Sequence, residues 1–230
     1  MSVFFTRRGA AATKLADTFS ENTWEQIIEA CQMNNVPDTW VIGDSKPMVI
    51  NNKLYQIDII GKNHDVYSDG TGNAPLTFQM HDCYDTKYAM HSSDTNSGSW
   101  PKCKMRTTNI PTVRSLMPIE VQSALRKVSK FTSAGSLSDN IDTSADDLFI
   151  LSEIEVFGVN SQSKAGEGVQ YEYYKNGNSV VKKLLNSTVI YWLRSPKNTN
   201  GGLYCCVNTT GDVRNYSPTS SAAISIAFCF

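Results

Sequence analysis

The stretch TVIYWLRSPKNTNGGLYCCVNTTGDVRNYSPTSSAAISIAFCF, residues 188–230, decides the fold. It contains three apolar runs, TVIYWLRSP, LYCCVN and AISIAFCF, and a TTGD turn separates LYCCVN from VRNY. Short apolar or alternating runs bounded by Gly, Pro, Asn and Asp are typical of antiparallel strands. The C-terminal stretch is therefore predicted to be all-β, with Trp192 in its core.

Two helices are predicted upstream of this stretch. Thr23 and Gln26 have the spacing of a capping box, in which both side chains satisfy free backbone amides. Behind them one apolar stripe recurs at helical spacing, formed by Trp24, Ile27, Ile28 and Cys31. This helix should end near Asn34. The second helix should begin at Pro118, and its stripe consists of Val121, Ala124, Leu125 and Val128.

Further strands are predicted in the first two thirds of the chain. They are expected at 39–44 (TWVIGD), at 47–50 and 53–61 around an Asn51-Asn52 turn, and within 146–158 (DDLFILSEIEVFG). In 53–61, Tyr55, Ile57 and Ile59 alternate with polar residues, which favours one buried face. The polar region 64–104 is interpreted as a packed functional loop region. Without a βαβ alternation, these elements predict an α+β fold with several short strands.

The composition limits the classes of partner. The 230 residues are enough for one compact domain, and the 21 Lys and Arg residues balance 22 Asp and Glu residues without forming a basic stripe. Nucleic acid is therefore not expected as a partner. The six cysteines show no C-x-x-C spacing, and most of them are interpreted as reduced, buried thiols.

The N-terminus suggests a separate role. In MSVFFTRRGAAATKLADTF the apolar residues precede the arginines, which is the reverse of a signal peptide, and they are too few to span a membrane. We expect synthesis in the bacterial cytoplasm without a signal peptide, and no membrane insertion. Residues 1–21 lack core periodicity and are predicted to be an anchoring or docking segment, with the folded domain at 22–230.

Candidate metal ligands lie in the polar region. They are His64, His81, His91, Asp65 and Asp82, whose spacing matches no helical zinc motif. The Asp- and Asn-rich run 63–73 offers oxygen ligands for calcium, although it lacks the spacing of a dedicated calcium loop. Hydrogen bonds within turns explain the same residues, so no cofactor is assigned and calcium stays open.

The sequence gives even less support for a catalytic site than for a metal site. Glu153 and Glu155, if they alternate on a strand, share one face and could imitate a glycosidase pair, but usually such residues form a polar face. Arg194 is interpreted as a structural arginine paired with a carboxylate such as Glu155 or Asp147. Cys205 and its neighbour have no local base. The chain is therefore not expected to be an enzyme.

The C-terminal stretch also concentrates residues that suit recognition surfaces. The candidate binding residues are Asn198, Asn200, Tyr204, Asn208, Arg214, Asn215, Tyr216, Ser217 and Thr219. Of these, Tyr204, Asn208, Arg214, Asn215 and Tyr216 are expected to form one exposed patch around the turn at 209–212. Composition alone leaves two interpretations open, an adaptable ligand face or the ordinary polar rim of a β-hairpin.

The residues quoted above also carry a resemblance to a known family. YWLRSP at 191–196, YCCVNTTGDV at 204–213 and the closing AFCF resemble the "WWLRSP … V…G … RPAF" signature of an uncharacterised domain family of Gram-positive bacteria and their phages. IDIIGKNHD, SWPKCKMR and DDLFILSEIEVFG match further blocks of that family in order. The chain has ISIA at 224–227 where many members have an Arg-Pro pair. The resemblance implies a C-type-lectin-like fold, related to the formylglycine-generating branch, whose C-terminal strands carry the ligand face.

Two main hypotheses for function follow from this resemblance. In the first, the chain is a phage or prophage virion surface protein, a tail adhesin or a head decoration or fibre protein, that binds a host-surface glycan or protein. In the second, it is a structural virion component that uses the same domain to bind other virion proteins. A homo-oligomer is expected in either case. A formylglycine-generating-like oxidase is a distant third hypothesis.

Overall fold

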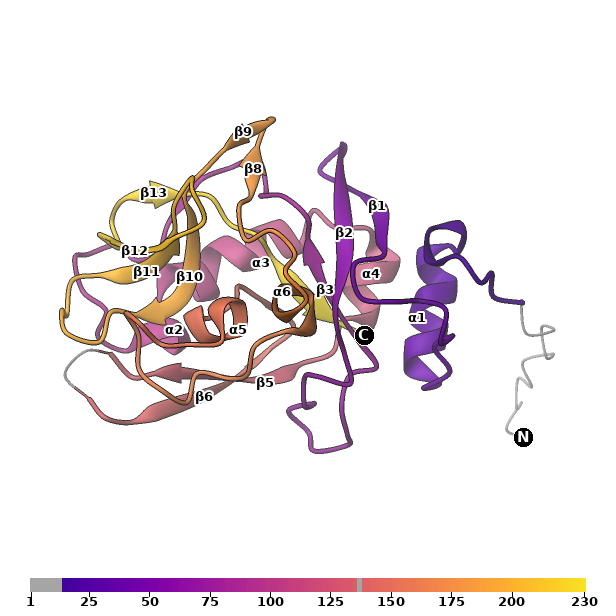
Figure 1. Ribbon diagram of the computed structural model, residues 1–230, viewed down its shortest axis with the longest axis horizontal. Helices are drawn as coiled ribbons and strands as arrows, with labels where there is room; N and C mark the ends of the chain where they lie inside the picture. Colours follow the sequence, from indigo (N-terminus) through magenta and orange to yellow (C-terminus); the bar gives the residue numbers. More distant parts are fainter. Residues whose placement is uncertain (1–13, 136–137) are drawn as a thin grey trace, which may run out of the picture.

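A five-stranded antiparallel sheet holds the centre of the molecule in the computed structural model, which describes residues 14–135 and 138–230 (Figure 1). In spatial order its strands are β1 (Ser45–Ile50), β2 (Lys53–Lys62), β3 (Leu76–Met80), β14 (Ala227–Cys229) and β7 (Leu148–Phe149). The last strand of the chain therefore lies between two strands from its first two thirds. The C-terminus is central to the fold.

A second antiparallel sheet has three strands, β10 (Tyr191–Pro196), β11 (Tyr204–Val207) and β12 (Val213–Tyr216), with β11 in the middle. Three two-stranded pairs complete the strands: β4 (Tyr88–Ala89) with β13 (Ser221–Ala222), β5 (Val128–Ser133) with β6 (Ile141–Asp146), and β8 (Lys183–Leu184) with β9 (Ser187–Thr188). Every one of these pairings is antiparallel. With the helices described next, they confirm the predicted α+β class.

The helices are short. They are η1 (Phe19–Glu21), α1 (Trp24–Gln32), α2 (Ser99–Lys102), the π-helix η2 (Met105–Asn109), α3 (Ile110–Arg114), α4 (Ile119–Ala124), α5 (Glu153–Phe157) and α6 (Glu172–Lys175). The capping box of α1 is confirmed, because the Thr23 hydroxyl accepts from the Gln26 amide and the Gln26 side chain accepts from the Thr23 amide. No helix within 14–135 and 138–230 is long and apolar enough to cross a membrane.

The expectation of two main helices is wrong. The helix that follows Pro118, α4, ends after six residues at Ala124, and Val128 belongs to β5. Likewise 39–44 forms turns and no strand. The interior strand predicted within 146–158 is not found, because the strand there is the two-residue β7, which lies at the edge of the five-stranded sheet. A second capping box at Ser152 starts helix α5 directly after it. Local capping overrides the apolar pattern here.

The hairpin predicted around Asn51-Asn52 is confirmed. β1 and β2 pair through this turn, and both asparagines have positive φ, 50° and 60°. The predicted alternation of burial fails, because residues 57–61 of β2 are all buried, Asp58 included. β2 lies inside the sheet between β1 and β3, and its C-terminal half is covered on both faces.

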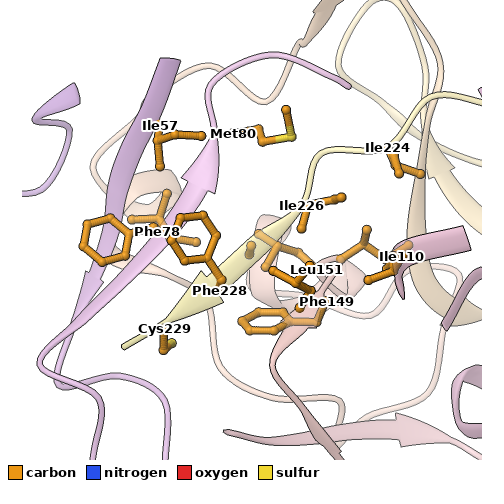
Figure 2. Packing of buried hydrophobic residues seen from close by; sticks show 14 of the residues in the cluster. Ile57, Phe78, Met80, Ile110, Phe149, Leu151, Ile224, Ile226, Phe228 and Cys229 are labelled. Atoms are coloured by element: carbon orange, nitrogen blue, oxygen red, sulfur yellow. The ribbon is translucent and has the colours of Figure 1, made fainter. Parts of the chain in front are cut away.

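The core is built around the C-terminal residues (Figure 2). The Phe78 and Phe228 rings stack with centroids 5.4 Å apart, and Ile226 and Phe149 lie in the same cluster. The Tyr67 hydroxyl donates to the Phe230 carbonyl at 2.6 Å. All six cysteines are buried and free, as predicted.

Two residues of the segment 14–21 pack into this core, the buried Phe19 and the partly buried Leu15. Phe19 is 1% exposed and packs against Trp24, Trp40 and Phe78. The Trp40 indole donates to the Ala16 carbonyl at 3.1 Å. The predicted docking role of the first 21 residues stays a prediction, and residues 1–13 lie outside the described residues.

Candidate binding face

The second sheet determines which of the predicted binding residues reach the surface. β12 is an edge strand, and its burial alternates, so Arg214 and Tyr216 are exposed. Asn215 lies on the opposite face of β12 and donates to Gln162 at 2.7 Å. Tyr204 is 0% exposed, because β11 is the central strand and is buried along its whole length. Its predicted place in an exposed patch is therefore wrong.

An exposed carboxylate organises the segment that follows β12. Asp94 accepts hydrogen bonds from the hydroxyls of Ser217 and Thr219, the latter at 2.7 Å, and these two hydroxyls lie 2.9 Å apart. The bonds lower the pKa of Asp94, so the carboxylate stays ionised at neutral pH. The backbone amide of His91 donates to the Pro218 carbonyl at 2.9 Å. Segment 91–94 thus holds segment 217–219 in one conformation.

A buried amide holds the neighbouring loop between β10 and β11. The Asn96 side chain is 1% exposed and donates to the carbonyls of Asn200 at 2.9 Å and Leu203 at 3.0 Å. Its backbone amide donates to Gly201 at 2.6 Å. Because these bonds are sheltered from water, they fix the loop more firmly than surface bonds would. The exposed side chains of Asn198 and Asn200 are therefore carried by a fixed backbone.

Six of the nine candidate residues lie at the two ends of this sheet. The β10–β11 loop and segment 217–219 meet at one end, next to Tyr216. Asn208 lies in the β11–β12 turn at the other end, where its side chain accepts from Thr210 and Asp212 and stabilises the turn. We call the first cluster the Asp94 face, made up of Asp94, Asn198, Asn200, Tyr216, Ser217 and Thr219. It lies at the end of the molecule opposite α1 (Figure 1).

The comparisons with known proteins concern this same part of the chain. Residues 77–230, about two thirds of the sequence, match the family described as "Domain of unknown function (DUF6273)". The chain belongs to the DUF6273 family. The matched segment begins inside β3 and contains the whole Asp94 face. Neither the comparison with curated proteins nor that with solved structures found a match.

The DUF6273 segment also contributes most of a buried ionic network. Arg194 forms a two-pronged ion pair with Glu155, with N–O distances of 2.5 and 2.7 Å. Lys130 bridges Glu155 and Asp65, at 2.7 Å to each. Burial alone would raise the pKa of Glu155, but Arg194 and Lys130 together lower it, so the carboxylate is ionised. The structural pairing predicted for Arg194 is confirmed, with Glu155 as its partner.

The two glutamates of this segment do not share a strand face as predicted, because both lie in helix α5. Glu153 is 0% exposed and accepts hydrogen bonds from the Ser161 hydroxyl and from the amides of Gln162 and Ser163. Glu155 is occupied by Arg194 and Lys130. Each carboxylate therefore holds parts of the protein together.

A buried acid lies beside this network. Glu167 accepts from the Ser133 amide at 2.8 Å and is hydrogen-bonded to the Ser195 hydroxyl. Burial raises its pKa to about 7. Burial also raises the pKa of the Cys206 thiol to about 12 and that of Cys205 well above its usual value. Both thiols are therefore protonated at neutral pH.

The candidate metal ligands do not converge. His64 stacks on Tyr171, His81 pairs with Asp58, and His91 accepts from the Ser92 amide. Across residues 14–135 and 138–230, no group of three His, Cys, Asp or Glu side chains could hold a metal ion. In the run proposed for calcium, Asp65 binds Lys130 and Asp69 binds Arg126, so both carboxylates already have a cationic partner.

The sequence-based interpretation missed three residues that shape the Asp94 face. Asp94, Asn96 and Gln162 each bind segments that are dozens of residues away in sequence. The only available signal was that region 64–104 is long, polar and anchored by isolated aromatic residues. That pattern indicated a packed loop region and could not identify its partners.

Proposed function

We propose that this DUF6273 chain is a non-catalytic binding domain of a phage or prophage virion, which presents the Asp94 face to a glycan or protein on the host cell surface. The observation that carries the proposal is the set of hydrogen bonds that holds this face in one conformation. Asp94 and Asn96 hold both of its loops through hydrogen bonds between residues far apart in sequence. A surface that is ordered before binding loses little entropy when a ligand arrives.

The chemistry of the face suits a carbohydrate. The Tyr216 ring is partly exposed and rests against buried Trp192, with ring centroids 5.7 Å apart. A supported aromatic ring can stack on the apolar side of a sugar. The neighbouring carboxylate of Asp94 and the amides of Asn198 and Asn200 can accept or donate hydrogen bonds to sugar hydroxyls. A protein epitope with exposed amides and an apolar side chain would meet the same groups.

We also propose that the α+β fold of this chain is a C-type-lectin-like domain. It is supported by the resemblance of the YWLRSP and AFCF segments, and it agrees with an α+β fold in which the C-terminal strands carry the exposed loops. Location at the virion surface and contacts with other virion proteins rest on the same resemblance.

One observation favours the alternative, a structural virion component. β12 is the edge strand of its sheet, and an edge strand can pair with a strand of another chain. Subunit assembly through β12 would bury Tyr216 and Arg214. Sedimentation of the purified chain separates the two hypotheses, since pairing through β12 predicts an oligomer that Tyr216→Ala dissociates.

The test of the proposed function is a binding screen of the purified chain against a glycan panel and intact Gram-positive cells. Wild type, Tyr216→Ala and Asn200→Ala are compared with Phe131→Ala, which removes an exposed aromatic ring of β5 outside the face. We expect capture by wild type and by the control, and reduced capture by the other two variants. Equal capture by all four proteins would exclude the Asp94 face as the binding site.

A further inference from the structure

A second concave site shares no residue with the Asp94 face. It is a cleft of about 310 Å³ between β2 and the β8–β9 hairpin. Its lining includes Leu54 and Tyr55 from β2, His81 from the end of β3, and Leu185 from the hairpin turn. In Figure 1 the β8–β9 hairpin and the β1–β2 turn project in the same direction. The volume is at the lower end of the range of small-molecule sites, roughly 300–1,000 Å³.

The hairpin wall of the cleft is firmly attached. Lys182, at the base of the hairpin, is buried and donates to the carbonyls of Met80 at 2.8 Å and His81 at 2.7 Å. The Lys183 amide donates to the Asp82 carboxylate at 2.7 Å, and the Cys83 amide donates to the Lys183 carbonyl. A buried ammonium group needs such acceptors to offset its lost hydration. The hairpin is therefore tied to the end of β3 and forms a rigid wall.

Apolar side chains lie exposed on both walls. Leu185 is 78% exposed at the hairpin turn, with φ at 51°, and Leu54 is 66% exposed on β2. A leucine in the left-handed region is strained, whereas Asn or Gly adopts this conformation more readily. Folding alone therefore favours another residue at this position. Both leucines line the cleft and offer an apolar surface to a ligand.

His81 supplies a directed polar group in the same cleft. Its Nδ1 lies 2.7 Å from the Asp58 carboxylate, which is buried, so the orientation of the ring is fixed. Its Nε2 has no hydrogen-bond partner within the described part of the chain, and the side chain is 53% exposed. The hydrogen bond to Asp58 raises the pKa of His81 although partial burial opposes the rise. The other charged or titratable groups around the ring and the cleft are Tyr55, Asp82, Cys83, Lys182, Lys183, Tyr173 and the Lys53–Asp85 ion pair.

We propose that this cleft binds a small ligand in which an oxyanion, a carboxylate or a phosphate monoester, is joined to an apolar group. The Nε2–H of protonated His81 donates to the oxyanion, and the apolar group packs between Leu54 and Leu185. Asp58 accepts from Nδ1–H, so Nε2 can donate only when the ring is protonated. Binding therefore weakens as the pH rises and His81 loses its proton. This site is independent of the proposed function of the Asp94 face.

The test uses hexanoate and hexyl phosphate as probes, with hexanol as the uncharged control. The imidazole signals of the protein are followed by NMR, which is practical because the chain has 3 histidines. We expect at least one of the two anions to shift the His81 signals at about pH 6 and to raise its pKa, since the ligand prefers the protonated ring. The anion that does so identifies the oxyanion. If neither moves the His81 signals, or if hexanol moves them equally, the proposal is wrong.

Two variants test the two halves of the site. His81→Gln should lower the affinity for the active anion about tenfold or more, as expected for loss of a charge-assisted hydrogen bond, while His91→Gln leaves the affinity unchanged. Leu185→Asn should weaken binding and leave the unfolding free energy equal or higher, because Asn suits the positive φ. Unchanged affinity in either His81→Gln or Leu185→Asn overturns the role given to that residue. Because the probes bind away from the Asp94 face, these results do not depend on any host-surface binding.

Discussion

Glu167 should make the protein less stable as the pH rises from about 5 to about 8. Burial raises its pKa from 4.5 to about 7. Between these two values the folded protein keeps a proton that the unfolded chain releases, so the free energy of unfolding falls as the pH increases. With about 1.36 kcal/mol per pKa unit, the full effect is about 3 kcal/mol, most of which is lost between pH 5 and pH 8.

The variant Glu167→Gln isolates this effect. Gln imitates the protonated acid, since its side-chain oxygen can accept from the Ser133 amide and its side-chain amide NH2 can donate to the Ser195 hydroxyl. His81, whose pKa is also raised, contributes stability that is likewise lost as the pH rises, but it does so in both proteins. Asp65 and Glu155, whose pKa values are lowered, stay ionised throughout this window.

The assay is urea unfolding at several pH values for wild type, Glu167→Gln and Glu29→Gln, a control at an exposed position of α1. Relative to wild type, Glu167→Gln should gain about 2–3 kcal/mol on going from about pH 5 to about pH 8, and the control should follow wild type. If the wild type and Glu167→Gln curves stay parallel, Glu167 is already ionised in the folded protein and the reasoning from burial fails.

Three further predictions concern stability and order. Trp192→Ala should cost about 3–5 kcal/mol of unfolding free energy, measured in urea, because the indole is fully buried; normal stability with lost binding would make Trp192 a ligand contact. Arg194→Met should cost about 3–5 kcal/mol of unfolding free energy because it leaves Glu155 partly unpaired. The double variant Arg194→Met, Glu155→Met should recover part of that loss in the same assay, and equal losses in the single and the double variant would contradict this account. Asn96→Ala should speed amide hydrogen exchange in the loop 197–203 with little change at β14, and unchanged exchange would show that Asn96 does not hold the loop.

Local signals predicted part of this fold well. The capping box at Thr23 and the asparagine pair at 51–52 act through neighbouring residues, and both are found as expected. The apolar C-terminal runs correspond to β10, β11 and β14. The segment 146–158 failed because its apolar residues fit a buried strand and a short buried helix equally well. The capping box at Ser152 was the signal that would have distinguished them.

The candidate site was predictable only in outline. The sequence placed Tyr216, Ser217 and Thr219 in a polar C-terminal region, but it could not show that β11 is covered on both faces, which buries Tyr204. The order of strands in a sheet depends on contacts between distant segments. Asp94 and Asn96 escaped prediction for the same reason, because their partners lie more than 100 residues further along the chain.

The most direct test of the central claim, that the Asp94 face binds a host-surface ligand, measures binding and folding in the same variants. Calorimetric titration with the glycan or cell-wall fragment that captures the wild type is paired with urea unfolding. Tyr216→Ala and Asn200→Ala should each lose about 1–2 kcal/mol of binding free energy and less than about 0.5 kcal/mol of unfolding free energy, while Phe131→Ala keeps its affinity. Large stability losses in Tyr216→Ala and Asn200→Ala with unchanged affinity would contradict the account and favour a structural role for this sheet.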